Sequence, residues 1–170
     1  MGLETVEMML FWEKAFGIEL NESEAARMRT PGSVADLFAE KLAAVDAPGP
    51  CLTRRAFVRI RNAAAQISGT PPDSITPKTR AASILHAKDH GALRDAAGIA
   101  GLPRPGFFGP KTFGDLSRWA VAYSPDSLRD TGAPWTRGEV RQVVRAVASD
   151  VLNLRRVKDT DDFYRDLGAG

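Results

Sequence analysis

The stretch Phe163-Tyr-Arg-Asp-Leu-Gly-Ala-Gly170 at the carboxyl end and the stretch Met1-Gly-Leu-Glu-Thr-Val-Glu-Met-Met9 at the amino end decide the expected fold. The second stretch runs on to Ala15-Phe16-Gly17, where the glycine predicts the end of a helix. Joined tail to head, the two stretches form one pattern, in which a loop with Asp-Leu-Gly leads into a helix.

The clearest predicted helix covers residues 137–152, where Thr136 and Glu139 have the spacing of a capping box. Its apolar residues recur at intervals of three and four, as on one buried helix face: Val140, Val143, Val144, Val147, Val151 and Leu152. Nearby sequence offers this face no partner, whereas the short helices of residues 4–45 need a further helix to enclose a core. The last helix is therefore expected to pack against residues 4–45.

The remaining periodic segments also repeat near 3.6 residues rather than 2, so the sequence predicts an all-α fold. In the first helix, Val6, Met9 and Leu10 are expected on the buried face, and Thr53 is expected to cap a helix in the middle of the chain. Other expected helix starts are Asn21 with Glu24, Thr30-Pro31-Gly32-Ser33 and Thr112. Further helices are expected over residues 22–28, 34–42, 57–67, 82–85 and 93–97.

Proline and glycine divide the chain into two expected domains. One consists of residues 1–47 plus 136–170, and the other is an insert of residues 51–123 that follows the linker Ala47-Pro48-Gly49-Pro50. Residues 124–135 are expected to form a polar linker. Residues 1–50 carry nine acidic and four basic side chains, a net charge of −5, whereas residues 51–123 carry eleven basic and four acidic ones, a net charge of +7. The basic insert is therefore expected to suit an acidic surface.

Composition narrows the class of protein. The chain has 44% hydrophobic residues, which supports a globular core, and it has no apolar run long enough for a membrane span. Its single cysteine, Cys51, fits a reducing compartment, so we expect a cytoplasmic protein. No motif or aromatic interleaving accompanies the basic residues, so we expect no nucleic-acid partner.

The joined ends resemble the central part of the acyl carrier protein family. In that family an Asp-Leu-Gly turn leads into Asp-Ser-Leu-Asp-Thr-Val-Glu-Leu and a helix that ends near Phe-Gly-Ile-Glu-Ile. The resemblance covers residues 1–45 and 137–170 in permuted order, with residues 137–152 in the place of the family's first helix. It implies a four-helix bundle whose first helix comes from the carboxyl end. Residues 51–123 resemble the same family more faintly, which implies a second, degenerate bundle in the usual order.

The resemblance also implies that this chain has lost the family's prosthetic group. The family attaches phosphopantetheine to a serine, but the equivalent position in the permuted bundle is Gly2, which has no hydroxyl group. In the middle unit the equivalent position is near Asp89, whose carboxylate is no acceptor either. Thr5 lies almost one helical turn beyond Gly2 and matches the family's own threonine. We therefore expect no phosphopantetheine cofactor.

Two other serines leave an alternative open, namely a functional carrier with a displaced attachment site. The tripeptide Asp126-Ser127-Leu128 spells the family's attachment sequence, although Tyr123-Ser124-Pro125 precedes it instead of Asp-Leu-Gly. In the alternative interpretation, which involves no modification, Ser127 is a turn residue in a linker. Ser83 is the serine nearest to the equivalent position in the middle unit.

What remains of the family is its docking face. Carrier proteins present their second helix to partner enzymes, and the resemblance places Glu4, Glu7, Met8 and Glu13 on that helix. Glu4 and Glu7 also suit a helix amino terminus, because the helix dipole favours anions there. The two interpretations, docking and helix stabilisation, remain open at this point.

Enzymatic and metal-dependent functions find little support in the sequence. His86 and His90 stand four residues apart, a spacing that could place both on one face of a helix. Only Asp89 accompanies them and no second pair of ligands is present, so we expect no metal site. The sequence therefore predicts a non-enzymatic docking module of a fatty-acid, lipid or polyketide-type pathway, with a carrier-dependent enzyme or another carrier as its partner. It also leaves two arrangements open, a monomer and a dimer that exchanges residues 137–152.

Overall fold

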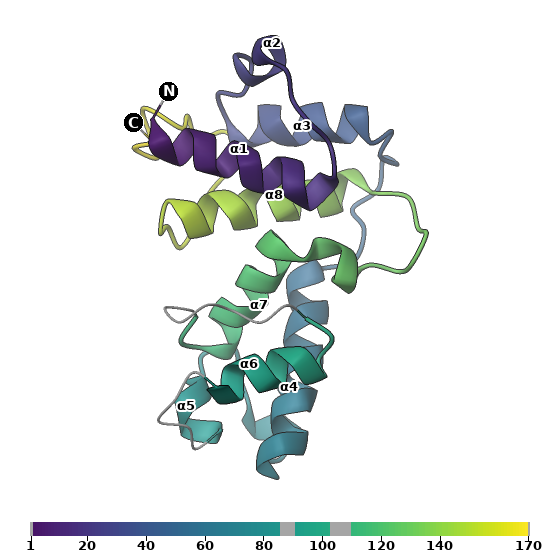
Figure 1. Ribbon diagram of the computed structural model, residues 1–170, viewed down its shortest axis with the longest axis vertical. Coiled ribbons are helices and arrows are strands. Elements are labelled where there is room, and N and C mark those ends of the chain that lie inside the picture. The colour runs from purple at the N-terminus through teal and green to yellow at the C-terminus, as the bar shows by residue number, and fades with distance from the viewer. Residues whose placement is uncertain (1, 86–90, 103–109, 170) are drawn as a thin grey trace. The chain divides into compact units, whose positions relative to one another are not determined.

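The computed structural model describes residues 2–85, 91–102 and 110–169 of the chain, and the regular secondary structure in these ranges is helical (Figure 1). Two isolated bridges, Val45 with Thr136 and Arg80 with Thr112, are the β-type pairings in the same ranges. The prediction of an all-α protein is therefore confirmed for the described residues.

The chain divides into two compact units. Unit 1 comprises Met1–Cys51 and Arg129–Gly170, and unit 2 comprises Leu52–Leu128. Unit 1 is thus built from two segments that are far apart in the sequence, whereas unit 2 is one continuous segment.

Unit 1 contains α1 (Leu3–Phe16), α2 (Glu22–Ala25), α3 (Pro31–Lys41) and α8 (Arg137–Val151). Helix α8 packs against both α1 and α3, and these three helices enclose the core (Figure 1). The predicted valine face of α8 is confirmed, because Val140, Val143, Val144 and Val147 are all fully buried. Capping boxes begin α2, α3 and α8, each at the residue that the sequence indicates: Asn21, Thr30 and Thr136.

The predicted buried face of α1 was wrong. Val6 and Leu10 are 39% and 59% exposed, and Met9 is only partly buried. The residues that face the core lie on another side of the same helix: Thr5, Met8, Trp12, Ala15 and Phe16. Because apolar residues surround this helix almost completely, packing against the rest of unit 1, and not periodicity, selects the buried side.

The segment after α3 runs along the beginning of α8. Val45 donates its backbone N–H to the Trp135 carbonyl oxygen at 2.8 Å, and Gly138 donates its own to Ala47 at 3.1 Å. A Cβ atom on Gly138 would collide with the backbone of Pro48, so only glycine allows this close approach. The contacts fix the amino end of α8 within unit 1.

Unit 2 contains α4 (Leu52–Ser68), η1 (Pro72–Ser74), α5 (Ala81–Ile84), α6 (Gly91–Ile99), α7 (Phe113–Tyr123) and η2 (Pro125–Leu128). Helix α4 packs against α6 and α7, and its Ala56, Ile60 and Ala64 are fully buried. Thr112 caps α7 as predicted. Thr53 does not begin α4, which starts one residue earlier at Leu52.

The segment 124–135 is not a free linker. Pro125 and Leu128 are buried in unit 2, and η2 receives hydrogen bonds from α4, where Arg55 donates to the Leu128 carbonyl oxygen at 3.2 Å. The other half of the segment belongs to unit 1, where the centroid of the Trp135 ring lies 5.2 Å from that of the Phe16 ring. Pro125 and Leu128, which are buried in unit 2, and the half-buried Trp135 in unit 1 thus attach the segment to both units in turn.

Candidate docking surface

Helix α1 is fixed within unit 1 by aromatic side chains on its inner face. The indole N–H of Trp12 donates to the Val144 carbonyl oxygen at 3.3 Å, and its ring centroid lies 5.8 Å from that of Phe163. At the end of the helix, the ring centroids of Phe16 and Phe38 lie 4.6 Å apart. These contacts determine which side of α1 faces solvent.

The outer face of α1 is an apolar stripe. Leu3 is 79% exposed, and Val6 and Leu10, three and seven residues further on, complete one side of the helix. Glu7 is exposed beside them, and Glu4 is half-buried in the first helical turn. We call Leu3, Val6, Glu7 and Leu10 the α1 stripe. Large apolar side chains grouped on one exposed face are typical of a protein interaction surface.

The predicted docking residues do not all belong to this surface. Met8 is fully buried, so it is a core residue and is unavailable to a partner. Glu13 is half-buried, and its Oε1 accepts the backbone N–H of Leu20 at 2.7 Å, which stabilises the turn after α1. Glu4 and Glu7 remain on the surface. Sequence reasoning missed Leu3, Val6 and Leu10 as surface residues because it assigned the apolar side of α1 to the core.

The expected serine-equivalent position lies at the start of α1. Gly2 is the N-cap residue, in extended conformation, and no side chain caps this helix. Thr5 is the nearest hydroxyl group, but it is buried, and its Oγ1 has no hydrogen-bond partner in the described part of the chain. A hydroxyl group within the core is not accessible to a transferase.

The two alternative serines make hydrogen bonds within unit 2. The Ser127 hydroxyl group donates to the Ser124 carbonyl oxygen at 2.8 Å, and the residue is half-buried in η2. Ser83 is exposed, and its hydroxyl group donates to the Arg80 carbonyl oxygen at 2.7 Å. The remaining candidates, His86, Asp89 and His90, lie outside the described residues.

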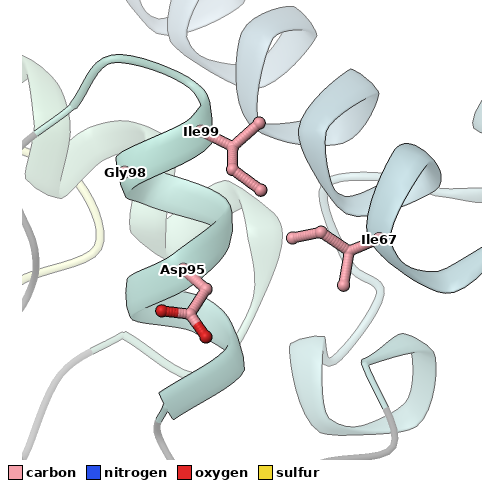
Figure 2. Close-up of a pocket in the computed structure, with 4 residues that line it drawn as sticks. All are labelled: Ile67, Asp95, Gly98 and Ile99. Carbon is pink, nitrogen blue, oxygen red and sulfur yellow. The ribbon is translucent and has the colours of Figure 1, made fainter.

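A second surface feature is an open hollow of about 470 Å³ in unit 2 (Figure 2). Ile67 of α4 and Ile99 of α6 lie on either side of it, and Asp95 and Gly98 complete the lining. A single carboxylate among apolar side chains lacks the converging polar groups of a typical active site. Within the described ranges, no cluster of His, Cys, Asp and Glu side chains is arranged to hold a metal ion.

Comparisons with known proteins and a search for membrane spans add two findings. No protein-family model, no curated protein and no solved structure matches this chain. Among the described residues, the helices are too short or too polar to cross a membrane.

Proposed function

We propose that this protein is an acyl-carrier-like docking module without a phosphopantetheine arm, and that the α1 stripe is its contact surface. The observation that carries the proposal is the exposed side of α1, where Leu3, Val6 and Leu10 lie together next to the carboxylate of Glu7. The resemblance of the chain ends to carrier proteins supports the same helix as the contact element. The partner would be a carrier-dependent enzyme or another carrier of a fatty-acid, lipid or polyketide-type pathway.

The chemistry of the surface suits a partner that combines apolar and basic side chains. Burial of exposed leucine and valine side chains provides about 25 cal/mol per Å² of apolar area. Carboxylates at the rim add attraction to arginine and lysine, which increases the rate of association and restricts the choice of partner. No covalent step is required, so the absence of a hydroxyl group at Gly2 is compatible with this function.

The first experiment tests the missing arm. The purified protein is incubated with coenzyme A and a phosphopantetheinyl transferase of broad specificity, and its mass is measured. We expect no gain in mass. A gain equal to the arm would contradict the proposal and support the alternative of a functional carrier. Its loss in Ser127→Ala or in Ser83→Ala would then identify the attachment site.

The second experiment tests the docking surface with the same transferase, which recognises the second helix of its carrier substrates. We expect the protein to inhibit the modification of an ordinary acyl carrier protein competitively, without being modified itself. The variant Val6→Lys should lose the inhibition, because it places a positive charge in the α1 stripe. The variant Val45→Lys, at an apolar position of unit 1 that is 48% exposed, is the matched control and should inhibit normally. Equal inhibition by both variants would exclude the α1 stripe.

A further inference from the structure

In both units a loop forms the same hydrogen bonds with the start of a helix, and we call this contact the interlock. In unit 1, Thr30 caps α3, and the Gly32 backbone N–H donates to the Asp159 carbonyl oxygen at 2.9 Å. In unit 2, Thr112 caps α7, and Gly114 donates in the same way to Pro77 at 2.8 Å. A Cβ atom on either glycine would lie 2.8 Å from that oxygen, so both loops approach the helix equally closely.

Three further hydrogen bonds repeat at the same interval. In these bonds each loop residue of unit 1 has a number 82 higher than its counterpart in unit 2, as Asp159 and Pro77 do, and each residue at the helix start has a number 82 lower, as Gly32 and Gly114 do. Phe163 donates its N–H to the Arg29 carbonyl oxygen, as Ala81 does to that of Lys111. Asp161 donates its N–H to the Lys158 carbonyl oxygen, as Thr79 does to that of Thr76. Lys158 in turn donates its N–H to Oδ2 of Asp161, as Thr76 does to Oγ1 of Thr79. The two loops are therefore equivalent residue by residue.

The helix that precedes each loop is equivalent as well. Asn153 follows the end of α8 and Gly69 follows the end of α4, both with positive φ, and these two residues are 84 apart. The same interval aligns buried residues of the two helices: Val140 with Ala56, Val144 with Ile60, Val147 with Ala63 and Ala148 with Ala64. It also places Arg145 of unit 1 at the position of Arg61 in unit 2.

In unit 1 two basic side chains at this interlock, Arg145 and Arg29, pair with acids of the loop. Arg145 makes two hydrogen bonds of 2.6 Å to the carboxylate of Asp159, and this pairing raises the pKa of the Arg145 guanidinium. Arg29 lies 3.4 Å from the carboxylate of Asp162. Both acids belong to the loop.

In unit 2 the two acids are missing. Pro77 stands at the position of Asp159, and Arg80 stands at the position of Asp162. Because Lys111 is the counterpart of Arg29, two basic residues occupy the positions that an ion pair occupies in unit 1. The Nε of Arg61 is buried without a hydrogen-bond partner among the described residues, although the side chain as a whole is half-buried. Lys78 is exposed on the same loop. The guanidinium carbon of Arg61 lies 5.8 Å from the centroid of the Phe57 ring, and among the described residues no carboxylate pairs with this guanidinium as Asp159 does with Arg145.

The chemistry of the surroundings decides what kind of anion fits. The backbone N–H groups of Phe113, Gly114 and Asp115 already donate to Thr79, Pro77 and Thr112, so they form no cradle for a small anion. The Asp115 carboxylate is engaged by Thr112 and by Arg118, at 2.5 Å, and does not neutralise the loop. Binding must therefore come from side chains, as it does for the Asp159 carboxylate in unit 1.

We propose that Arg61, Lys78, Arg80 and Lys111 form a binding surface for an acidic protein segment, and that a carboxylate of that segment pairs with the Arg61 guanidinium, in the place of the Asp159 carboxylate that pairs with Arg145 in unit 1. Arginine and carboxylate form parallel hydrogen bonds, which gives such a contact both strength and a fixed geometry. The surface lies in unit 2, so it is separate from the α1 stripe and provides a second place for a partner to bind.

The test uses the full chain and a fluorescein-labelled poly-glutamate peptide. We expect the peptide to bind in low salt, to shift the Arg61 Nε–Hε resonance in a ¹H–¹⁵N spectrum, and to dissociate as salt screens the charges. Arg61→Lys should weaken binding about tenfold, because it retains the charge but loses the two-pronged geometry. An unchanged Arg61 resonance at saturating peptide would overturn the proposal.

A second variant keeps the test valid if replacement of Arg61 disturbs the fold. Arg80→Asp recreates the acid that unit 1 has at Asp162, so it should raise the melting temperature while it weakens peptide binding. Arg155→Asp makes the same charge change at an exposed position of unit 1 and should do neither. Equal loss of binding in both variants would show that binding depends on the net charge of the chain and would overturn the proposal.

Two competitors distinguish the source of the anion. Inorganic phosphate should not displace the peptide at equal concentration, because the backbone N–H groups of Phe113, Gly114 and Asp115 at the helix start already donate within unit 2. Single-stranded DNA should bind more weakly than the peptide and should leave the Arg61 resonance in place. Tighter binding of phosphate or DNA than of the peptide would overturn the assignment to an acidic protein segment.

Discussion

The indole N–H of Trp12 donates a hydrogen bond of 3.3 Å to the backbone carbonyl oxygen of Val144, across 132 positions of sequence. Both residues are fully buried, so the bond ties α1 to α8 inside the core of unit 1. It joins the two segments of which this unit is made.

This contact leads to a first prediction. Trp12→Phe removes the hydrogen bond but retains an aromatic ring, so we expect a loss of about 1 kcal/mol in the free energy of unfolding. Trp12→Ala also leaves a cavity and should cost about 3–5 kcal/mol. Denaturant unfolding of unit 1, followed by near-ultraviolet circular dichroism, measures both. Trp119→Phe, at a half-buried position of unit 2, serves as the control and should leave the transition of unit 1 in place.

The orientation of α1 gives a second prediction. Met8→Ala should destabilise the protein by about 2–5 kcal/mol, because Met8 is fully buried. Leu10→Ser, two residues further on, should change stability by no more than about 0.5 kcal/mol, since its side chain is mostly exposed. Chemical denaturation of the two variants side by side tests the assignment. A larger loss for Leu10→Ser than for Met8→Ala would mean that the helix is turned the other way.

The start of α8 gives a third prediction. The Thr136 hydroxyl oxygen accepts the Glu139 N–H at 3.1 Å, and the Glu139 carboxylate accepts the Thr136 N–H at 3.0 Å. Thr136→Ala should cost about 1 kcal/mol, as is typical for a lost N-cap. Thermal unfolding measures the effect, and Thr160→Ala, in an exposed loop position, is the control that should be neutral.

A fourth prediction concerns acid. Backbone N–H donation from Arg165, and then from Tyr164, together with the charge of Arg29, holds the pKa of Asp162 below its usual range despite some desolvation. Because the folded-state pKa is lower than the unfolded one, the carboxylate stabilises the fold at pH values above about 4. This contribution is lost as the pH falls through the depressed pKa. Carboxyl-carbon NMR should show that Asp162 becomes protonated at a lower pH than an ordinary aspartate. Asp162→Asn should remove the contribution of this carboxylate to the pH dependence of the free energy of unfolding.

Part of the structure could be predicted from the sequence. The caps at Asn21, Thr30, Thr112 and Thr136 were predicted correctly, because each depends on side chains a few residues apart. The valine face of α8 was also predicted, since polar residues mark its opposite side. The contact of this helix with α1 and α3 followed from its need for an apolar partner.

Other features could not be predicted because they depend on long-range packing. Nearly every residue from Val6 to Trp12 in α1 is apolar, so local sequence did not indicate which of them form the core. The buried anchors Pro125 and Leu128 were hidden in a segment whose Ser, Asp, Gly and Pro content is typical of linkers. The replacement of Asp159 and Asp162 by Pro77 and Arg80 depends on an equivalence between two loops whose sequences have little in common, so local sequence did not indicate it.

The division of unit 1 into two segments affects how the chain folds as it is synthesised. Unit 2 is continuous, so its helices can assemble as soon as residue 128 has left the ribosome. Residues 1–51 leave before unit 2, but the inner sides of α1 and α3 stay uncovered until α8 follows, and α8 begins only at residue 137. During that interval chaperones and the neighbouring nascent chains have access to Trp12 and Phe38, so slower elongation after residue 128 should increase the fraction of newly made protein that aggregates.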